Sequence, residues 1–235
     1  MPSPQPTPAR QRRKEARPQE LLSAALDLFV EKGFSAARSD EVAARAGVSK
    51  GTLYLYFPSK EELFKAVIRT NLSALIAQGQ TIADQYEGSS AELLRLLLHS
   101  WWQRVGDTSA GGIFKIIIAE VRNFPELAQF YTDEVVIPAH RLLSGTLQRG
   151  IARGEFRRVP LHEATHALIT PLLFMTLHKH SVGACSAMRP DIDPVRLIDT
   201  QIDLILHGLQ LQPGQSGKTP RARNGGAASA RRKNS

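Results

Sequence analysis

The sequence has 235 residues, of which 42% are hydrophobic and 22% charged, a composition typical of a globular protein with a sizeable core. The first twenty residues contain no apolar stretch, and the most apolar segment, ALITPLLFMTL, is far shorter than a membrane helix. We therefore expect neither a secretory signal nor a membrane span. Cys185 is the only cysteine, which excludes an intramolecular disulfide and favours a reducing cytoplasm.

The formal net charge of +8 is concentrated at the two ends of the chain. Residues 1–17 carry five basic side chains and one acidic one, and residues 213–235 carry six basic side chains and no acidic one, which leaves −2 for residues 18–212. Both ends are poor in large apolar residues, so we expect a disordered basic arm and a disordered basic tail. They would either add non-specific affinity for DNA phosphates or serve as solvated arms without a specific role.

Between these ends, apolar residues recur with helical spacing, beginning with a stripe from Leu22 to Val30 that Gly33 ends. Ser39 is the expected N-cap of the second helix, and no segment has a convincing strand pattern. The sequence predicts an all-α fold of about nine helices, near residues 18–32, 40–46, 50–56, 59–83, 90–105, 111–122, 125–153, 160–182 and 194–211. Pro138 and Pro171 lie inside two of these helices and predict kinks.

Residues 39–64, SDEVAARAGVSKGTLYLYFPSKEELF, place a short helix, a Gly-Val-Ser turn and a second short helix in succession, as in a helix-turn-helix. Gly47 can take the left-handed conformation that the turn needs. Leu53 and Phe57 are one turn apart and suit a small core, which leaves Lys50 and Tyr54 on another face. This second helix is therefore the candidate DNA-reading element.

The same stretch closely resembles the DNA-binding domain of tetracycline-repressor (TetR) type regulators, whose signature reads IAxxAGVSxGTLYxYFxSKEEL, because this chain has VAARAGVSKGTLYLYFPSKEEL. The resemblance covers about residues 18–65 and implies a three-helix domain there. It implies that the residues facing double-stranded DNA are Ser39, Ser49, Lys50, Gly51, Thr52, Tyr54, Tyr56 and Lys60.

Several of these residues also have a simpler interpretation. Tyr54 and Tyr56 alternate with apolar positions and could belong to the core, and Lys60 could be a solvated charge. Leu55 departs from the aromatic or histidine residues common in the family near this position. It could touch a thymine methyl group or pack inward.

For residues 66–212 the resemblance implies a helical ligand-binding and dimerisation domain. The helices near 160–182 and 194–211 of two copies would pair as a four-helix bundle, and the homodimer would bind a palindromic operator. The second of these helices has the required apolar stripe, formed by Leu197, Ile198, Ile202, Ile205 and Leu209.

Aromatic and histidine residues in this region are either core residues or the lining of an effector pocket. The pocket candidates are Trp102, Phe114, His140, Phe174 and His178, with Trp101, Phe130, Tyr131 and Met175 as further possibilities. We expect a small, largely hydrophobic or aromatic effector that favours a conformer with low operator affinity.

Residues 162–166 read HEATH, an H-E-x-x-H string that would place two zinc-binding histidines on one helix face. A zinc peptidase needs a third ligand and an open coordination position. The extended peptidase pattern would require glycine and histidine where this chain has Ile169 and Leu172, and no glutamate follows the string. Asp191 and Asp193, each next to a proline, remain as weak candidates for the third ligand. We therefore expect no resident metal, and a regulatory metal on His162 and His166 is the alternative.

Two function classes follow from the sequence: a dimeric, ligand-responsive transcriptional regulator and a metal-dependent hydrolase. The regulator is the prediction, because the helix-turn-helix string is specific and the hydrolase lacks a ligand set. We expect no enzymatic activity, no cofactor and a cytoplasmic, nucleoid-associated location. We also expect a repressor, with an activator as the alternative.

Overall fold

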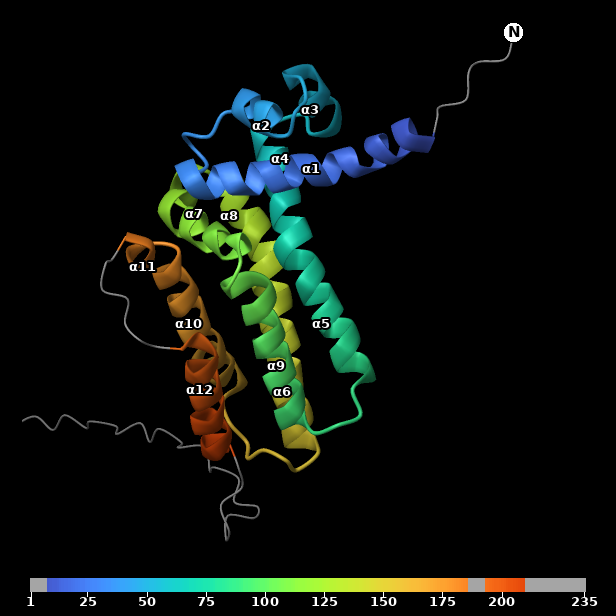
Figure 1. Cartoon of the computed structure of the whole chain (residues 1–235). Helices are drawn as coiled ribbons and strands as arrows, with labels where there is room; N and C mark the ends of the chain where they lie inside the picture. The colour runs from blue at the N-terminus through green and yellow to red at the C-terminus, as the bar shows by residue number, and fades with distance from the viewer. Residues whose placement is uncertain (1–7, 186–192, 210–235) are drawn as a thin grey trace, which may run out of the picture.

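The computed structural model describes residues 8–185 and 193–209, with side chains from Arg17 onward. These residues form helices joined by short connections and contain no strand (Figure 1). Residues 1–7 of the predicted basic arm and all of the predicted tail at 213–235 lie outside the described residues. The predicted all-α class is confirmed for the described part of the chain.

The N-terminal part contains four helices: α1 (Pro8–Lys32), α2 (Ser39–Arg45), α3 (Lys50–Tyr56) and α4 (Lys60–Ile68). They close around the buried rings of Phe29, Phe34 and Phe64, whose centroids lie 5.1–5.7 Å apart. Such tilted and edge-on aromatic contacts add to the stabilisation that burial provides. The sequence places the start of the first helix at residue 18, but α1 begins at Pro8 and continues through Pro18.

The remaining elements form an elongated bundle below this part (Figure 1). Its α-helices are α5 (Ala74–Gln85), α6 (Ser90–Trp101), α7 (Gly112–Glu120), α8 (Pro125–Tyr131), α9 (Ile137–Ala152), α10 (Leu161–Lys179), α11 (Val182–Cys185) and α12 (Pro194–Leu209). Three π-helical segments interrupt them, η1 (Arg69–Ser73), η2 (Trp102–Gly106) and η5 (Thr132–Val136), and two 3₁₀ turns flank α7, η3 (Ser109–Gly111) and η4 (Val121–Asn123).

Each of the nine predicted segments contains a helix in the described residues, with residues 210 and 211 of the last segment outside them, but the predicted kinks at the two prolines take different forms. The π segment η5 ends at Val136, two residues before Pro138, which has no N–H to donate to the carbonyl of residue 134. Pro171 lies inside α10 without interrupting it. Because Pro171 has no N–H, the Ala167 carbonyl oxygen lacks its helical partner. The Gln201 side chain of α12 donates to this oxygen and, at 2.9 Å, to the Leu168 carbonyl oxygen.

Most helix starts follow the sequence. Ser49, Ser59 and Ser89 each accept a hydrogen bond from the backbone N–H three residues further on. The prediction for Ser39 is wrong, because the N-cap of α2 is Arg38, whose extended backbone donates its N–H to the Glu41 carboxylate. Ser39 is instead the first helical residue, and it is buried.

Two hydrophobic cores hold the molecule together. The first begins in α1 and continues past residue 65 into η2, α7, α8 and η5, so helices α1 to α4 and the bundle share apolar contacts. The second joins α6, α9, α10 and α12, and Ile198, Ile202 and Leu206 supply the buried stripe of α12. No helix in the described residues is both long and apolar enough to cross a bilayer.

Candidate DNA-binding surface and effector cavity

The turn between α2 and α3 exposes the first residues of α3. Gly47 has a φ of 66°, a conformation that costs glycine little, and the Val48 N–H returns to the Ala43 carbonyl at 2.9 Å. The Ser49 hydroxyl caps α3 by accepting from the Thr52 N–H at 3.1 Å, and it lies 2.9 Å from the Thr52 hydroxyl. The start of α3 is therefore fixed with its side chains directed outward.

One face of α3 is buried and the other is open. Leu53 is fully buried, whereas Leu55 is 84% exposed and Tyr54 is 40% exposed. The Lys50 ammonium lies 5.9 Å from the centre of the Tyr54 ring, so the cation and the phenol belong to one patch. Leu55 therefore does not pack inward. Of the two roles considered for it from the sequence, the contact with a thymine methyl group remains.

Gly51 lies in this patch with free space above it. A Cβ at this position would meet only the Ser49 hydroxyl, at 3.8 Å. No internal contact therefore requires glycine here, and a phosphate or base edge has room to approach the backbone.

Three of the predicted DNA-facing residues are turned inward, and the first of them, Ser39 at the start of α2, is buried. Tyr56 is half-buried and packs against the first core. The Lys60 ammonium donates to the carbonyls of Phe34, Ser35 and Ala37 at 2.9–3.2 Å, which uses all three of its N–H bonds. Lys60 therefore fixes the turn between α1 and α2, and its contact with DNA stays a prediction.

Ion pairs attach α2 to α1 and leave Lys50 available. Arg45 binds Glu31 through two 2.7 Å hydrogen bonds, and these lower the pKa of the Glu31 carboxyl. Lys32 binds Glu41 at 2.6 Å. Lys50 takes part in no ion pair among the residues whose side chains are described.

A cavity of about 240 Å³ lies within the bundle. Apolar side chains from α5, α6, α9 and α10 make up most of its wall, and the π segments η1, η2 and η5 all contribute to it. Trp101, Phe114, Tyr131 and His140 line it, and burial raises the pKa of the Tyr131 hydroxyl above its ordinary value. The cavity therefore suits an apolar ligand with few polar groups.

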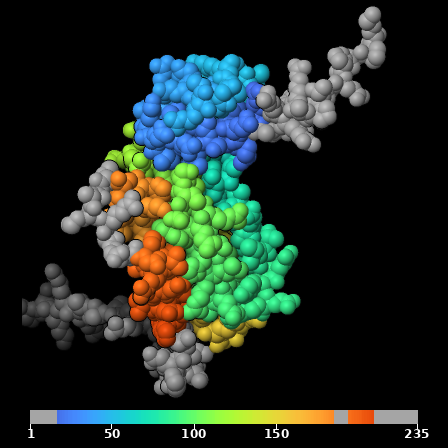
Figure 2. Space-filling model, viewed as in Figure 1, coloured from blue at the N-terminus to red at the C-terminus, as the bar shows by residue number. Residues whose placement is uncertain are grey.

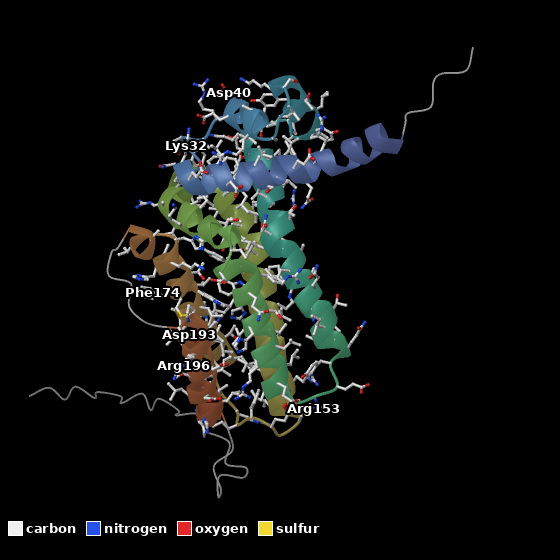
Figure 3. All side chains as sticks on the ribbon, in the orientation of Figure 1. Lys32, Asp40, Arg153, Phe174, Asp193 and Arg196 are labelled. Carbon is white, nitrogen blue, oxygen red and sulfur yellow. The ribbon has the colours of Figure 1, made fainter. Side chains whose placement is uncertain are left out.

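Of the five pocket candidates, Phe114 and His140 line the cavity, and the structure places the other three elsewhere. Trp102 is buried in the second core beside Gly106. Phe174 is 67% exposed on the outer side of α10 (Figure 3), with the His178 ring stacked 6.4 Å away. The sequence could not distinguish Trp101, which lines the cavity, from its neighbour Trp102, which does not.

One carboxylate joins the bundle to the N-terminal part. Glu120, at the end of α7, accepts hydrogen bonds from the backbone N–H groups of Phe34 at 2.8 Å and Ser35 at 2.6 Å, and from the Ser35 hydroxyl. Gly33 has a φ of 81°, and a Cβ there would overlap the Glu120 carboxylate. Nothing in the local sequence pattern indicated this contact, because it joins residues far apart in the chain.

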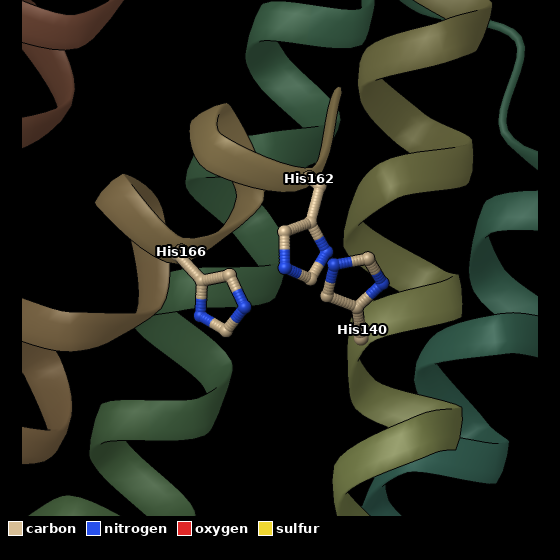
Figure 4. A group of neighbouring side chains, drawn as sticks. All are labelled: His140, His162 and His166. Carbon is tan, nitrogen blue, oxygen red and sulfur yellow. The ribbon is translucent and has the colours of Figure 1, made fainter. Parts of the chain in front are cut away.

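Three histidines meet at the edge of the cavity. His162 and His166 lie one turn apart on α10, and His140 reaches them from α9 (Figure 4). Their ring centroids are 4.5–5.6 Å apart. Burial and then the neighbouring imidazoles lower the pKa of His140. The HEATH string pairs His162 with His166 but gives no sign of His140, which the sequence predicts only as a pocket residue.

Comparison with known proteins agrees with this architecture. The family model "Bacterial regulatory proteins, tetR family" matches residues 21–67, and "Tetracyclin repressor-like, C-terminal domain" matches residues 84–183. The HTH-type transcriptional regulator YfiR of Bacillus subtilis is 32% identical over 148 residues, which cover 62% of this chain and 71% of YfiR. The chain belongs to the TetR family.

Other TetR-family members extend the likeness. The transcriptional repressor KstR2 of Rhodococcus jostii is 31% identical over 145 residues, or 61% of this chain and 70% of KstR2. The solved structure of FadR from Bacillus subtilis in complex with stearoyl-CoA has the same fold, with a TM-score of 0.67 at 20% identity over 82% of this chain and 99% of FadR. As a TetR-family protein, the chain is a transcriptional regulator and not an enzyme.

Proposed function

We propose that this TetR-family regulator is a homodimeric repressor that binds a palindromic operator through α3 and is released by a small apolar effector in the cavity. The observation that carries the proposal is the exposed patch of Lys50, Gly51, Tyr54 and Leu55 on a helix whose opposite face is buried. Lys50 and Tyr54 suit phosphate oxygens, and Leu55 suits a thymine methyl group. Residues 18–70 carry equal numbers of basic and acidic side chains, so binding depends on this local placement.

The outer faces of α10 and α12 support the proposed dimer. Leu204 on α12 is 71% exposed and Phe174 on α10 is 67% exposed, and the two helices lie side by side at the surface (Figures 1 and 2). Large exposed apolar residues on neighbouring helices suit a protein interface. A two-fold arrangement through this face would present two α3 helices to the two halves of a palindrome.

The connection between the cavity and α4 supports the proposed release. The elements α4, η1 and α5 follow one another without a loop. Helix α4 belongs to the N-terminal helices that carry α3, while Leu72 of η1 and Leu75 of α5 line the cavity. Arg69 of η1 binds Glu134 of η5 at 2.9 Å, beside the cavity wall. A ligand that favours one arrangement of these π segments would move α4 and change the spacing of the two α3 helices.

The names of relatives support two points of the proposal. KstR2 is named as a repressor, although FasR of Mycolicibacterium smegmatis, 45% identical over 64 residues, is named as an activator. The stearoyl-CoA bound to FadR of Bacillus subtilis is a ligand with a long apolar chain. An apolar effector for the present cavity is consistent with that precedent and with the composition of its wall.

The test is a selection of random and genomic DNA fragments by the purified protein at about 150 mM salt, where non-specific phosphate binding is weak. The Lys50→Ala/Tyr54→Ala variant runs beside it, with Arg158→Ala as a charge-matched control. Arg158 is exposed in the connection between α9 and α10, at the end of the molecule opposite α3 (Figure 1).

We expect the protein and the Arg158→Ala control to enrich one palindromic sequence, and the double variant to lose at least about tenfold in affinity for it, or ~1.4 kcal/mol. Enrichment of a sequence without two-fold symmetry would contradict the dimeric mode of binding. Equal enrichment by the double variant would contradict the assignment of α3.

A further inference from the structure

We propose that His140, His162 and His166 bind a divalent transition-metal ion at the wall of the cavity. Each side chain offers one ring nitrogen, and these three atoms lie within 4.8 Å of one another. They come from two helices, because His162 and His166 are one turn apart on α10 and His140 projects from α9 (Figure 4). Packing of α9 against α10 thus supplies the third ligand that HEATH lacks.

The polar groups of this cluster lack partners. The Nε2 atom of His140 is buried without a hydrogen-bond partner. In the described part of the chain, no hydrogen bond reaches the ring nitrogens of His162 or His166 either. A buried polar atom without a partner is costly, and a metal ion would satisfy the His140 nitrogen and draw the other two rings toward it.

The spacing fits a metal after a small adjustment. An ion at the centre of a triangle with 4.8 Å sides would lie roughly 2.8 Å from each nitrogen, against the ~2.0–2.1 Å of a zinc–imidazole bond. His162 and His166 are exposed, so rotation of their side chains can supply most of the difference. Three imidazoles without a carboxylate favour Zn²⁺, Co²⁺, Ni²⁺ or Cu²⁺ over Mg²⁺ and Ca²⁺.

The position of the three histidines at the cavity edge indicates which chemical class of ligand the cavity would bind. His140 and His166 both line the cavity, so an ion held between them would stand at its edge. Three protein ligands leave a tetrahedral ion one open position, which an anionic oxygen can occupy. We infer an apolar effector that carries a carboxylate, an inference that rests on the effector role proposed above.

The first test is a titration of the chelator-treated, full-length protein with Co²⁺ and Zn²⁺, followed by the visible absorption of bound Co²⁺. Variants are His140→Ala, His162→Ala and, as a matched control on the same helix, His178→Ala. We expect one ion per chain and no change in His178→Ala. Each cluster variant should bind at least about tenfold more weakly, since even the loss of an outer-sphere partner costs that much.

His140→Ala decides between this site and simple binding by the histidine pair on α10. Affinity equal to that of the unaltered protein would overturn the three-histidine site, as would the absence of stoichiometric binding by the unaltered protein. Circular dichroism establishes that each variant is folded, and His140→Gln, which keeps a side chain of similar size, serves if His140→Ala is not folded.

The second test compares octanoate with octanol, which have equal chain length, on metal-loaded and chelated protein. Octanoate should bind at least about tenfold more tightly to the loaded form, while octanol should bind both forms alike. Equal octanoate binding to the two forms would overturn the assigned ligand class. The operator selection requires no metal, so failure of the metal site and failure of the proposed regulator would be separate results.

Discussion

At the scale of single residues, Gly51 is a position where the fold does not require glycine but DNA binding can. It is exposed on α3, and a side chain there would meet only the Ser49 hydroxyl. Alanine is favoured over glycine within helices by up to ~1 kcal/mol. Glycine at this position therefore has no structural reason inside the free protein.

We predict that Gly51→Ala folds at least as stably as the unaltered protein and binds the selected operator at least about tenfold more weakly, because its methyl group would occupy space needed by the DNA. Thermal unfolding measures the first effect and fluorescence anisotropy with labelled operator the second. Gly145→Ala is the control, because a Cβ there meets nothing within 4 Å and α9 lies away from α3. Unchanged operator affinity in Gly51→Ala would contradict close approach of the backbone.

Glu120 is a second residue whose role depends on the whole structure. We predict that Glu120→Ala lowers the free energy of unfolding by about 1–3 kcal/mol, because it removes the acceptor of the Phe34 and Ser35 N–H groups. Denaturant unfolding measures the change. Glu87→Ala, an exposed position with no recorded side-chain partner in the described residues, should leave stability within about 0.5 kcal/mol. Equal effects would show that the Glu120 contact adds nothing.

The sequence could predict residues whose roles are local and could not predict those that depend on packing. The exposure of Lys50 and Tyr54 and the burial of Leu53 follow from helical spacing within α3. The inward direction of Lys60 depends on carbonyls of a turn more than twenty residues earlier in the chain. The three-histidine cluster likewise exists only because α9 packs against α10.

At the scale of elements, helix position was predictable and helix regularity was not. Apolar spacing located the segments, since this signal is local, whereas the single serine cap predicted above, Ser39, was wrong. A π segment needs an extra residue within a turn, and its place depends on contacts with other helices. Here η1 and η5 are joined by the Arg69–Glu134 ion pair and both line the cavity.

We predict that Pro138→Ala raises the effector concentration needed to release the operator at least about tenfold. The alanine restores an N–H that allows η5 to relax into a regular α-helix. Pro171→Ala should have the smaller effect, because α10 is uninterrupted at that residue and Gln201 already serves the freed carbonyls. Operator anisotropy during effector titration provides the measurement. An intact response in Pro138→Ala would exclude η5 as the moving element.

At the scale of the whole molecule, the proposed function requires two copies with a fixed spacing between their α3 helices. We predict that Leu204→Glu weakens self-association at least about tenfold and abolishes palindrome binding, because it places a charge in the proposed apolar interface. Sedimentation velocity measures the oligomeric state. Ile118→Glu, with 64% exposure on α7, is the matched control and should remain dimeric. Dissociation of both variants, or of neither, would place the interface elsewhere.

The two adjacent tryptophans are the only ones in the chain, and they face different surroundings. Trp101 lines the cavity with Phe114 5.8 Å from it, while Trp102 is 3% exposed in the second core, with the Lys179 ammonium 5.8 Å from its ring. Displacement of water by a ligand would change the emission of Trp101 and leave that of Trp102 nearly constant. If the proposed effector binds in the cavity, Trp101 reports the occupancy by fluorescence and Trp102 is an internal reference, one peptide bond apart.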